Sequence, residues 1–254
     1  MTEVPRDGRE PAAIALTPIL SARYREDDLA RIRAAAPGAR LVSVSLEGLS
    51  DSPLDDVEVL LRGPLRTANF DRLLARCPNL RWVHSATAGV ERVLTKDAEA
   101  RGLIITNARG VFSEPIAEYT VMMILSVLRR LPELFELQGE RTWQPLPARE
   151  MRQVTIGLVG LGSIVRSVAR LALGFGARVI GTRKEPDLRK DFTEPMPDGL
   201  DRILEHDQLP ELLAESDFVV LAVPLTPDTD KLMNGPRLAQ MKPGSWLINV
   251  ARGR

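Results

Sequence analysis

The chain has 254 residues, 44% of them hydrophobic, and 34 basic side chains balance 34 acidic ones. The length favours two domains at roughly 150 residues each, and the hydrophobic content is sufficient for sizeable cores. The zero net charge argues against a general nucleic-acid or membrane-surface binder, and no apolar run reaches the roughly 18 residues of a membrane span.

The polar N-terminus, Met1–Pro11, is expected to be a frayed tail rather than a signal peptide. Cys77 is the only cysteine, so no internal disulfide can form and a reducing cytoplasm is the expected location. We expect Cys77 to be a small buried core residue rather than a catalytic thiol.

The first hundred residues alternate short apolar runs with helical patterns. Strands are predicted at Ala13–Thr17, Leu41–Ser45, Val57–Leu61, Arg81–His84 and Ile104–Thr106. Helices are predicted at Arg23–Ala36 and Thr67–Arg76. Such alternation is typical of a parallel sheet covered by helices, so residues 1–108 are expected to form a first α/β domain.

A long helix is predicted from about Glu114 to about Gln138, with Pro115 in its first turn. Pro132 should kink or divide this helix, because proline lacks the N–H donor and clashes with the preceding turn. The stretch Gly139–Arg149 contains a tryptophan and two prolines and is expected to be a connecting loop.

A second α/β unit is predicted to begin near Gln153, within a second domain of residues 109–254. Its strands are predicted at Val154–Val159, Arg178–Thr182, Phe218–Val223 and Trp246–Val250. Its helices are predicted near Ser163–Phe175, Leu209–Ala214 and Pro236–Met241. The polar, proline-rich stretch Asp187–Asp207 is left without an assignment.

The stretch Thr155–Val168 carries the strongest local signal of the sequence. Its apolar strand ends in Gly160-Leu161-Gly162, and a helical pattern starts at once. The first amide groups of such a helix have no intrahelical partner, and the helix dipole favours an anion there. This pattern is the dinucleotide-binding fingerprint, in which Gly160 makes the tight turn and Gly162 lets a pyrophosphate approach. An ordinary glycine-rich turn in an α/β domain is the alternative.

Two further strands lead into segments that contain candidate ligand-binding residues. The strand from Phe218 continues as Val223-Pro224-Leu225-Thr226-Pro227, and the strand from Trp246 delivers Asn249 and Arg252. Ligands of open parallel sheets bind beyond the carboxyl ends of the strands. Arg252 is well placed to grip a carboxylate by two parallel hydrogen bonds, although a surface salt bridge is the alternative.

Five motifs in order resemble the D-2-hydroxyacid dehydrogenases, from about residue 40 to the end of the sequence. They are Ser85-Ala86-Thr87-Ala88-Gly89-Val90-Glu91, Thr106-Asn107-Ala108-Arg109-Gly110 leading to Ala117-Glu118-Tyr119, the Gly160 loop, Val223-Pro224-Leu225-Thr226-Pro227, and Asn249-Val250-Ala251-Arg252-Gly253. The resemblance implies an α/β fold of two doubly wound parallel-sheet domains. The first is a flavodoxin-like substrate domain, and the second is a Rossmann NAD(P)-binding domain that is incomplete at its C-terminus.

The resemblance also implies an activity, which is hydride transfer between a nicotinamide and a small 2-oxo or 2-hydroxy acid. Arg252 matches the arginine that holds the substrate carboxylate and polarises its carbonyl. Backbone amides of Ala88, Gly89 and Val90 would help to bind the carboxylate. The implied cofactor-binding residues are Gly160, Gly162, Ser163, Ile164, Val223, Pro224, Thr229, Val250, Ala251 and Arg252. A homodimer formed through residues 114–143 is implied, and neither a metal nor a nucleic-acid or membrane partner is expected.

Three departures from the family pattern qualify these expectations. A proton-exchanging histidine and an orienting glutamate normally follow the arginine segment, whereas this sequence stops at Arg254. We therefore expect impaired catalysis, an exposed sheet edge and poor solubility. His84, before the substrate loop, is expected to be a hydrogen-bonded residue rather than a substitute acid, and His206 a solvated one. Val165 replaces the third glycine and should strain the packing between helix and strand.

The third departure concerns the cofactor. NAD sites usually carry an acidic residue about 20 residues after the glycine turn, for the ribose 2′-hydroxyl. Here Thr182, Arg183 and Lys184 offer a hydroxyl and two cations, so NADP(H) is favoured over NAD(H).

Other functions remain open on the sequence alone. One is a non-catalytic dinucleotide-binding sensor or interaction protein, and another is an inactive fragment. A methyltransferase would need an acidic residue near Thr182, and none is suitably placed. The substrate is also open, with glyoxylate, hydroxypyruvate and pyruvate as alternatives.

Overall fold

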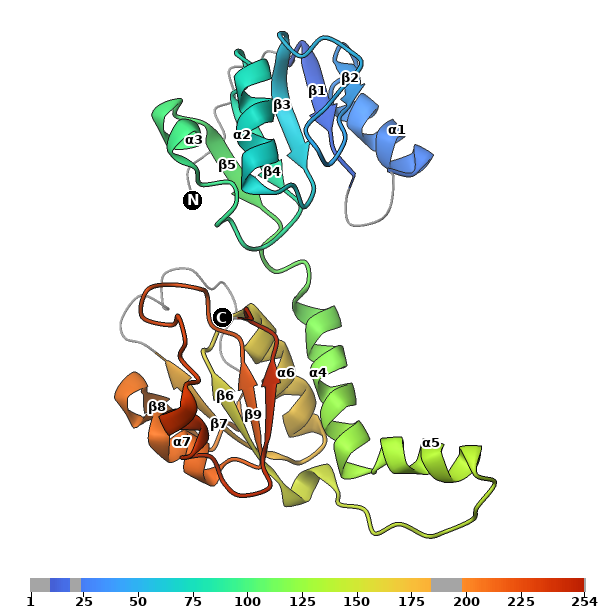
Figure 1. The fold of residues 1–254 in the computed structure, drawn as a ribbon, viewed down its shortest axis with the longest axis vertical. Coiled ribbons are helices and arrows are strands. Elements are labelled where there is room, and N and C mark those ends of the chain that lie inside the picture. Colours follow the sequence, from blue (N-terminus) through green and yellow to red (C-terminus); the bar gives the residue numbers. More distant parts are fainter. Residues whose placement is uncertain (1–9, 19–23, 184–197, 254) are drawn as a thin grey trace. The chain divides into compact units, whose positions relative to one another are not determined.

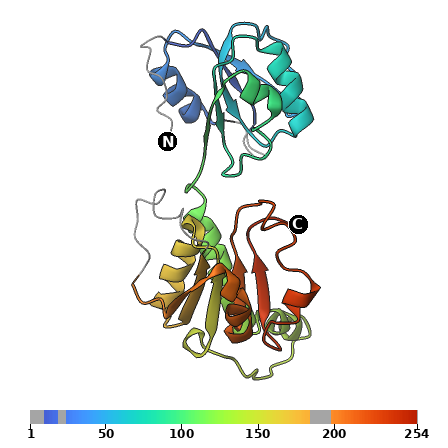
Figure 2. The ribbon, with the colours of Figure 1, turned by 90° about the vertical axis from the view of Figure 1, so that its left-hand side faces the viewer.

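The computed structural model describes residues 10–18, 24–183 and 198–253. The chain divides into two compact units, Met1–Val111 and Phe112–Arg254, called unit 1 and unit 2 below. Each unit holds one five-stranded sheet, and every described strand pair is parallel (Figures 1 and 2). The predicted α/β class with two parallel sheets is confirmed.

Unit 1 has the sheet order β2-β1-β3-β4-β5, the order of flavodoxin-like folds. Its strands are β1 (Ala13–Leu16), β2 (Arg40–Ser43), β3 (Val57–Arg62), β4 (Trp82–Ser85) and β5 (Ile104–Asn107). Its helices are α1 (Glu26–Ala35), α2 (Thr67–Arg76) and α3 (Lys96–Ala100).

The helices of unit 1 cover the sheet on both faces. Phe70 and Leu73 of α2 lie in the larger core, whereas α1 packs with Ile14 and Leu16 on the opposite face. Cys77 belongs to the larger core, as predicted, and burial raises the pKa of its thiol to about 11. A thiol with that pKa is protonated and unreactive at neutral pH.

Unit 2 has the sheet order β10-β9-β6-β7-β8. Its strands are β6 (Thr155–Val159), β7 (Arg178–Arg183), β8 (Arg202–Glu205), β9 (Phe218–Leu221) and β10 (Trp246–Asn249). Its helices are α4 (Ser113–Leu128), α5 (Leu131–Gly139), α6 (Ser163–Gly174), α7 (Leu209–Glu215) and α8 (Gly235–Leu238). The first strand of the unit is central, and the chain order reverses between β6 and β9. This is the doubly wound arrangement, with its ligand crevice at the reversal point.

Pro132 divides the predicted long helix, as the sequence indicated. Helix α4 ends at Leu128, and α5 begins at Leu131 with Pro132 in its first turn. Arg130 between them has a left-handed φ of 53°, which turns the chain out of the line of α4. Proline is tolerated there because the first amide groups of a helix have no partner within it.

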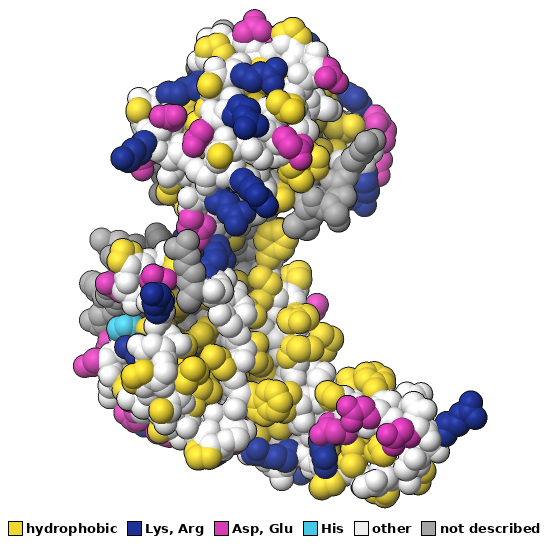
Figure 3. Space-filling model, viewed as in Figure 1, with side chains coloured by type: hydrophobic (Ala, Val, Ile, Leu, Met, Phe, Trp, Pro, Cys, Tyr) yellow, Lys and Arg dark blue, Asp and Glu magenta, His cyan; other side chains and the backbone are white. Residues whose placement is uncertain are grey.

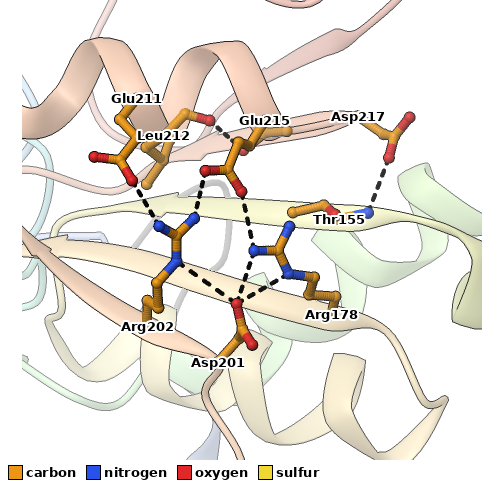
Figure 4. Close-up of polar contacts among 9 residues, drawn as sticks. Thr155, Arg178, Asp201, Arg202, Glu211, Leu212, Glu215 and Asp217 are labelled. Carbon is orange, nitrogen blue, oxygen red and sulfur yellow. Dashed lines mark hydrogen bonds and ion pairs between the residues drawn. The ribbon is translucent and has the colours of Figure 1, made fainter.

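Strand β8 was not predicted, because its four residues lie in the stretch that the sequence left unassigned. Residues 187–197 of that stretch lie outside the described part. An ion-pair network joins the start of β8 to β7 and α7 (Figure 4). Arg202 pairs with Glu211 at 2.6 Å and with Glu215, and Arg178 pairs with Asp201 at 2.8 Å and Glu215 at 2.9 Å. These side chains are about 30–45% exposed, so each ion pair contributes little to the free energy of unfolding. The network chiefly holds the edge strand β8 in place.

A buried carboxylate fixes the opposite end of unit 2 from its glycine turn. Asp217, at the amino end of β9, accepts hydrogen bonds from the Thr155 amide at 2.9 Å, Lys242 Nζ at 2.9 Å and Arg149 Nη2 at 3.3 Å. Burial acts to raise the pKa of Asp217, but the bonds from Thr155 and Lys242 outweigh it and hold the pKa below its usual value.

We expect Asp217→Asn to lower the free energy of unfolding by about 2–3 kcal/mol at pH 7, the scale of hydrogen bonds to a charged group. A lowered folded-state pKa stabilises the protein above the unfolded pKa of about 3.9, and the contribution is lost as pH falls through the folded value. Urea titrations at pH 7 and pH 3.5 should show the difference from wild type shrinking in acid. Asp201→Asn, at a more exposed carboxylate, is the control; an equal loss at both pH values would contradict the ionic role.

Candidate functional site

The glycine turn of unit 2 joins β6 to α6. Gly160 adopts a left-handed φ of 90°, and its amide donates to Thr182 O at 3.2 Å. Gly162 is the N-cap residue of α6, and no side chain caps this helix. The amide groups of the first turn, starting at Ser163 and Ile164, therefore remain available to an anion.

The two glycines are required for different reasons. A Cβ on Gly160 would lie 3.0 Å from Val223 Cγ1 and 3.3 Å from Ala222 O, so the residue must be small for the protein itself. A Cβ on Gly162 would meet no atom within 4 Å. The open space at Gly162, beside free helix amides, fits a dinucleotide pyrophosphate.

Val165 stands where the sequence predicts strained packing between helix and strand. It is fully buried in the core of unit 2, in the same cluster as Leu158 of β6, Leu161 and Ala117 of α4. The side chain thus lies in the core that α6 shares with α4 and β6, and the predicted strain stays a prediction.

The segment after β9 lies beside the glycine turn at the reversal point of the sheet. The Ala222 amide donates to Val159 O at 3.1 Å, and Val223 lines the position of Gly160. Thr229 donates to Pro224 O at 2.5 Å and accepts from the Thr226 amide at 2.8 Å. Its hydroxyl proton is thus used within the loop, so Thr229 shapes the turn that presents Pro224.

The segment after β10 is a small hydrogen-bonded turn that ends in Arg252. The Val250 amide donates to Leu221 O at 3.0 Å, which ties the turn to β9. Asn249 accepts from the Ala251 amide at 2.9 Å and donates to Arg252 O at 2.8 Å. Arg252 is exposed and donates to Ala251 O at 2.9 Å, so its guanidinium is at the surface beside this rim.

The residues predicted to choose the cofactor lie at the end of β7. Thr182 is 1% exposed, so its hydroxyl lies inside unit 2 in this structure. Arg183 is the last residue of β7, its side chain is not described, and Lys184 lies outside the described residues. Arg183 and Lys184, rather than the buried Thr182, are therefore the residues expected to favour NADP(H).

In unit 1, the predicted substrate residues lie in the 86–92 loop, which follows β4. The carbonyl groups of Ala88, Gly89 and Val90 all accept hydrogen bonds. Asn107 Nδ2 donates to Ala88 O at 2.7 Å, Thr87 Oγ1 donates to Gly89 O at 3.0 Å, and Val90 O accepts from two amides of the following turn. The amides of Ala88, Gly89 and Val90 have no acceptor among the described residues. The loop therefore offers three consecutive donors, an arrangement that suits an anion.

The two histidines have different surroundings. His84 Nδ1 lies 2.8 Å from Thr106 Oγ1, which also accepts from Trp82 Nε1 at 2.9 Å. Burial lowers the pKa of His84, so it is neutral at pH 7 and is the hydrogen-bonded residue that the sequence favoured. His206 lies in a single turn after β8. The described residues contain no group of three or more metal-ligating side chains, and no described helix is long and apolar enough to cross a membrane.

Sequence reasoning missed the residues that hold the 86–92 loop. Asn107 stood inside one of the quoted motifs, but its contact with Ala88 spans 19 residues and no local pattern reports it. Arg62, considered below, was visible as an arginine that ends an apolar strand.

The sheet of unit 2, with its glycine turn at the reversal point, defines a dinucleotide-binding protein of the Rossmann type. The chain belongs to the D-isomer specific 2-hydroxyacid dehydrogenase family. The family's NAD binding domain matches residues 121–254, and its catalytic domain matches residues 53–184.

Known relatives agree with this assignment. The chain is 35% identical over 188 residues to a glyoxylate reductase of Thermococcus kodakarensis, covering 70% of this chain and 54% of that protein. The chain thus spans about half the length of the relatives that it matches.

Among solved structures, one of the family from Xanthobacter autotrophicus in complex with NADPH and MES has a TM-score of 0.72 at 26% identity, covering 96% of this chain and 73% of that one. An NADPH-dependent glyoxylate/hydroxypyruvate reductase of Sinorhizobium meliloti has a TM-score of 0.73 at 25% identity, with coverage of 96% and 73%.

Proposed function

We propose that this chain supports hydride transfer between a nicotinamide and a small 2-oxo or 2-hydroxy acid of the glyoxylate or hydroxypyruvate type. The observation that carries the proposal is the hydrogen-bonded rim formed by the segments after β6, β9 and β10. That rim joins an open glycine turn to an exposed arginine. The glyoxylate reductases among its relatives support the choice of substrate class.

Each element of the proposal has a defined task. The bound nicotinamide supplies or accepts the hydride. Gly162 leaves room for the pyrophosphate, and the amides of Ser163 and Ile164 bind it. Arg252 holds the substrate carboxylate with two parallel hydrogen bonds and polarises the neighbouring carbonyl. In unit 1, the amides of Ala88, Gly89 and Val90 are the proposed donors to a carboxylate. His84 is given no acid role, since its lowered pKa favours the neutral imidazole over the imidazolium at pH 7.

The test is to measure NADPH binding by fluorescence and glyoxylate-dependent NADPH oxidation at 340 nm on the same preparation. Binding with turnover supports the proposal. Binding without turnover, while oxalate still binds the NADPH complex, favours the alternative of a dinucleotide sensor. Failure to bind NADPH and, in the same fluorescence assay, NADH contradicts both functions.

For the cofactor, we expect NADPH to bind more tightly than NADH. Arg183 and Lys184 would contact the 2′-phosphate, and an NADPH-dependent relative supports this choice. Arg183→Ala should weaken NADPH binding about 10–100-fold, the scale of one hydrogen bond to a charged group, and leave NADH binding within about twofold. Dissociation constants for both cofactors check this. Parallel losses for NADH and NADPH would show that Arg183 does not read the 2′-phosphate.

We further propose that the chain forms a homodimer through α4 and α5. A groove there is lined mainly by apolar side chains, and apolar side chains gather over both helices (Figure 3). Met122 of α4 lines the groove and is exposed, and Phe135 of α5 and Trp143 in the segment after α5 are exposed as well. A contiguous apolar surface of this kind marks an interaction site. Phe135→Asp should convert a dimer into a monomer in analytical ultracentrifugation, whereas a wild-type monomer at micromolar concentration would contradict the proposal.

A further inference from the structure

We propose that Arg62 is a positioning residue that fixes the 86–92 loop and places a buried positive charge beside it. The inference rests on the proposed role of that loop in binding a substrate carboxylate. Arg62 is the last residue of β3 and pairs in register with Ser85, the last residue of β4. It therefore stands at the point where the loop leaves the sheet.

Arg62 contacts both ends of the loop. Its carbonyl accepts from the Ala86 amide at 2.8 Å, at the start of the loop. Its Nη2 donates to Arg92 O at 3.3 Å, at the end of the loop. Arg62 thus joins the two ends of the 86–92 loop. The free amides of Ala88, Gly89 and Val90 lie between the two contacts in the sequence.

The guanidinium is itself held firmly. Its Nη1 donates to Gly63 O at 3.2 Å and its Nη2 to Leu65 O at 2.6 Å. Its Cζ lies 5.1 Å from the centre of the Phe70 ring, a cation–π contact. The base of this segment is also fixed, because the Gly63 amide donates to Thr17 Oγ1 at 2.6 Å. A side chain with this many fixed contacts can transmit its geometry to the loop.

No carboxylate in the described part of the chain pairs with Arg62. The residue is 1% exposed, and its hydrogen bonds go to backbone carbonyls alone. Its Nε has no partner among the described residues. A buried cation without a counter-ion is costly, and desolvation lowers the pKa of Arg62 to about 10. An anion bound at the nearby loop amides would offset this cost. Arg62 is therefore expected to favour a bound carboxylate without touching it.

The experiment compares wild type with Arg62→Met and Arg62→Lys in the full chain. Two readouts are used, namely hydrogen exchange at the amides of residues 88–92 and the dissociation constant of oxalate, a carboxylate probe, in the presence of NADPH. Arg62→Met should speed exchange at these amides at least tenfold and weaken oxalate binding at least tenfold. Arg62→Lys keeps the charge but loses the planar fork, so its effect on oxalate should be smaller than that of Arg62→Met.

Arg101 provides a matched control in the same unit. Its guanidinium also donates to backbone carbonyls, those of Leu74, Cys77, Pro78 and Leu80, which lie away from the 86–92 loop. Arg101→Met should lower the melting temperature while exchange at residues 88–92 and oxalate binding stay within about twofold of wild type. If Arg62→Met does not fold, Arg62→Lys carries the same two readouts with the same direction of change.

The outcomes separate this inference from the proposed function. Unchanged exchange at residues 88–92 in a folded Arg62 variant overturns the positioning role. If oxalate and glyoxylate do not bind wild type, the proposed function fails. Faster loop exchange in Arg62→Met would still support the role of Arg62 in fixing the loop. If Arg101→Met loosens the loop as much as Arg62→Met, the effect is general destabilisation of unit 1 and the inference is wrong.

Discussion

Replacing Arg252 with methionine should lower kcat/KM for glyoxylate by at least about 10³-fold. Losing one donor that stabilises transition-state charge typically costs about 10²–10³-fold. Loss of the hydrogen bonds to the carboxylate adds about 1.5–3 kcal/mol, or a further 10–100-fold. The guanidinium is exposed at the surface and donates to Ala251 O at 2.9 Å, so its removal should leave the fold intact. Steady-state kinetics with NADPH, together with a thermal melt, measure both effects.

Two variants make the Arg252 experiment decisive. Arg252→Lys keeps the positive charge but cannot form two parallel bonds, so its activity should fall between those of wild type and Arg252→Met. Arg237→Met is the matched control, because Arg237 also donates to a backbone carbonyl, Leu232 O at 3.3 Å, but belongs to α8 rather than to the rim. Activity of Arg252→Met within tenfold of wild type would exclude Arg252 as the carboxylate anchor.

The fold was largely accessible from the sequence because its main signals are local. Buried parallel strands appear as short apolar runs, and the division at Pro132 follows from the chemistry of proline. Two elements were not predicted from the sequence, namely α3 with five residues and β8 with four. Both are short and polar, so contacts distant in sequence determine them. Arg202 of β8, for example, is held by Glu211 and Glu215 of α7.

The candidate site could be predicted from the sequence only where a local sequence pattern determines the backbone. Gly160 and Gly162 mark a turn and a helix start, which are properties of a few neighbouring residues. The state of the 86–92 loop depends instead on side chains far away, with Asn107 contacting Ala88 across 19 residues and Arg62 contacting Arg92 across 30. The packing of Val165 also depends on tertiary contacts, because its side chain lies in a core built from α4, α6 and β6.

Gly162→Val should weaken NADPH binding by about 100-fold or more while leaving the free energy of unfolding within about 1 kcal/mol of wild type. The backbone at Gly162 is extended, with φ −75°, so valine is allowed there, and its Cβ would meet no protein atom within 4 Å. Replacing a glycine at an N-cap position costs only a modest amount of stability. The new side chain would instead occupy the space beside the helix amides, and losing two charge-assisted hydrogen bonds there costs about 3–6 kcal/mol.

Gly160→Val and Gly235→Val are the two control variants for Gly162→Val. Gly160 has a φ of 90°, and its Cβ would press on Val223 and Ala222 O, so Gly160→Val should lose stability and NADPH binding together. Gly235 also has open space around it, with no atom within 4 Å of a Cβ, but it lies in α8, so Gly235→Val should leave NADPH binding unchanged. Selective loss of binding in Gly162→Val alone would identify the first turn of α6 as the pyrophosphate site. Wild-type affinity in that variant would mean that NADPH binds elsewhere, because no dinucleotide could share the space with a valine side chain.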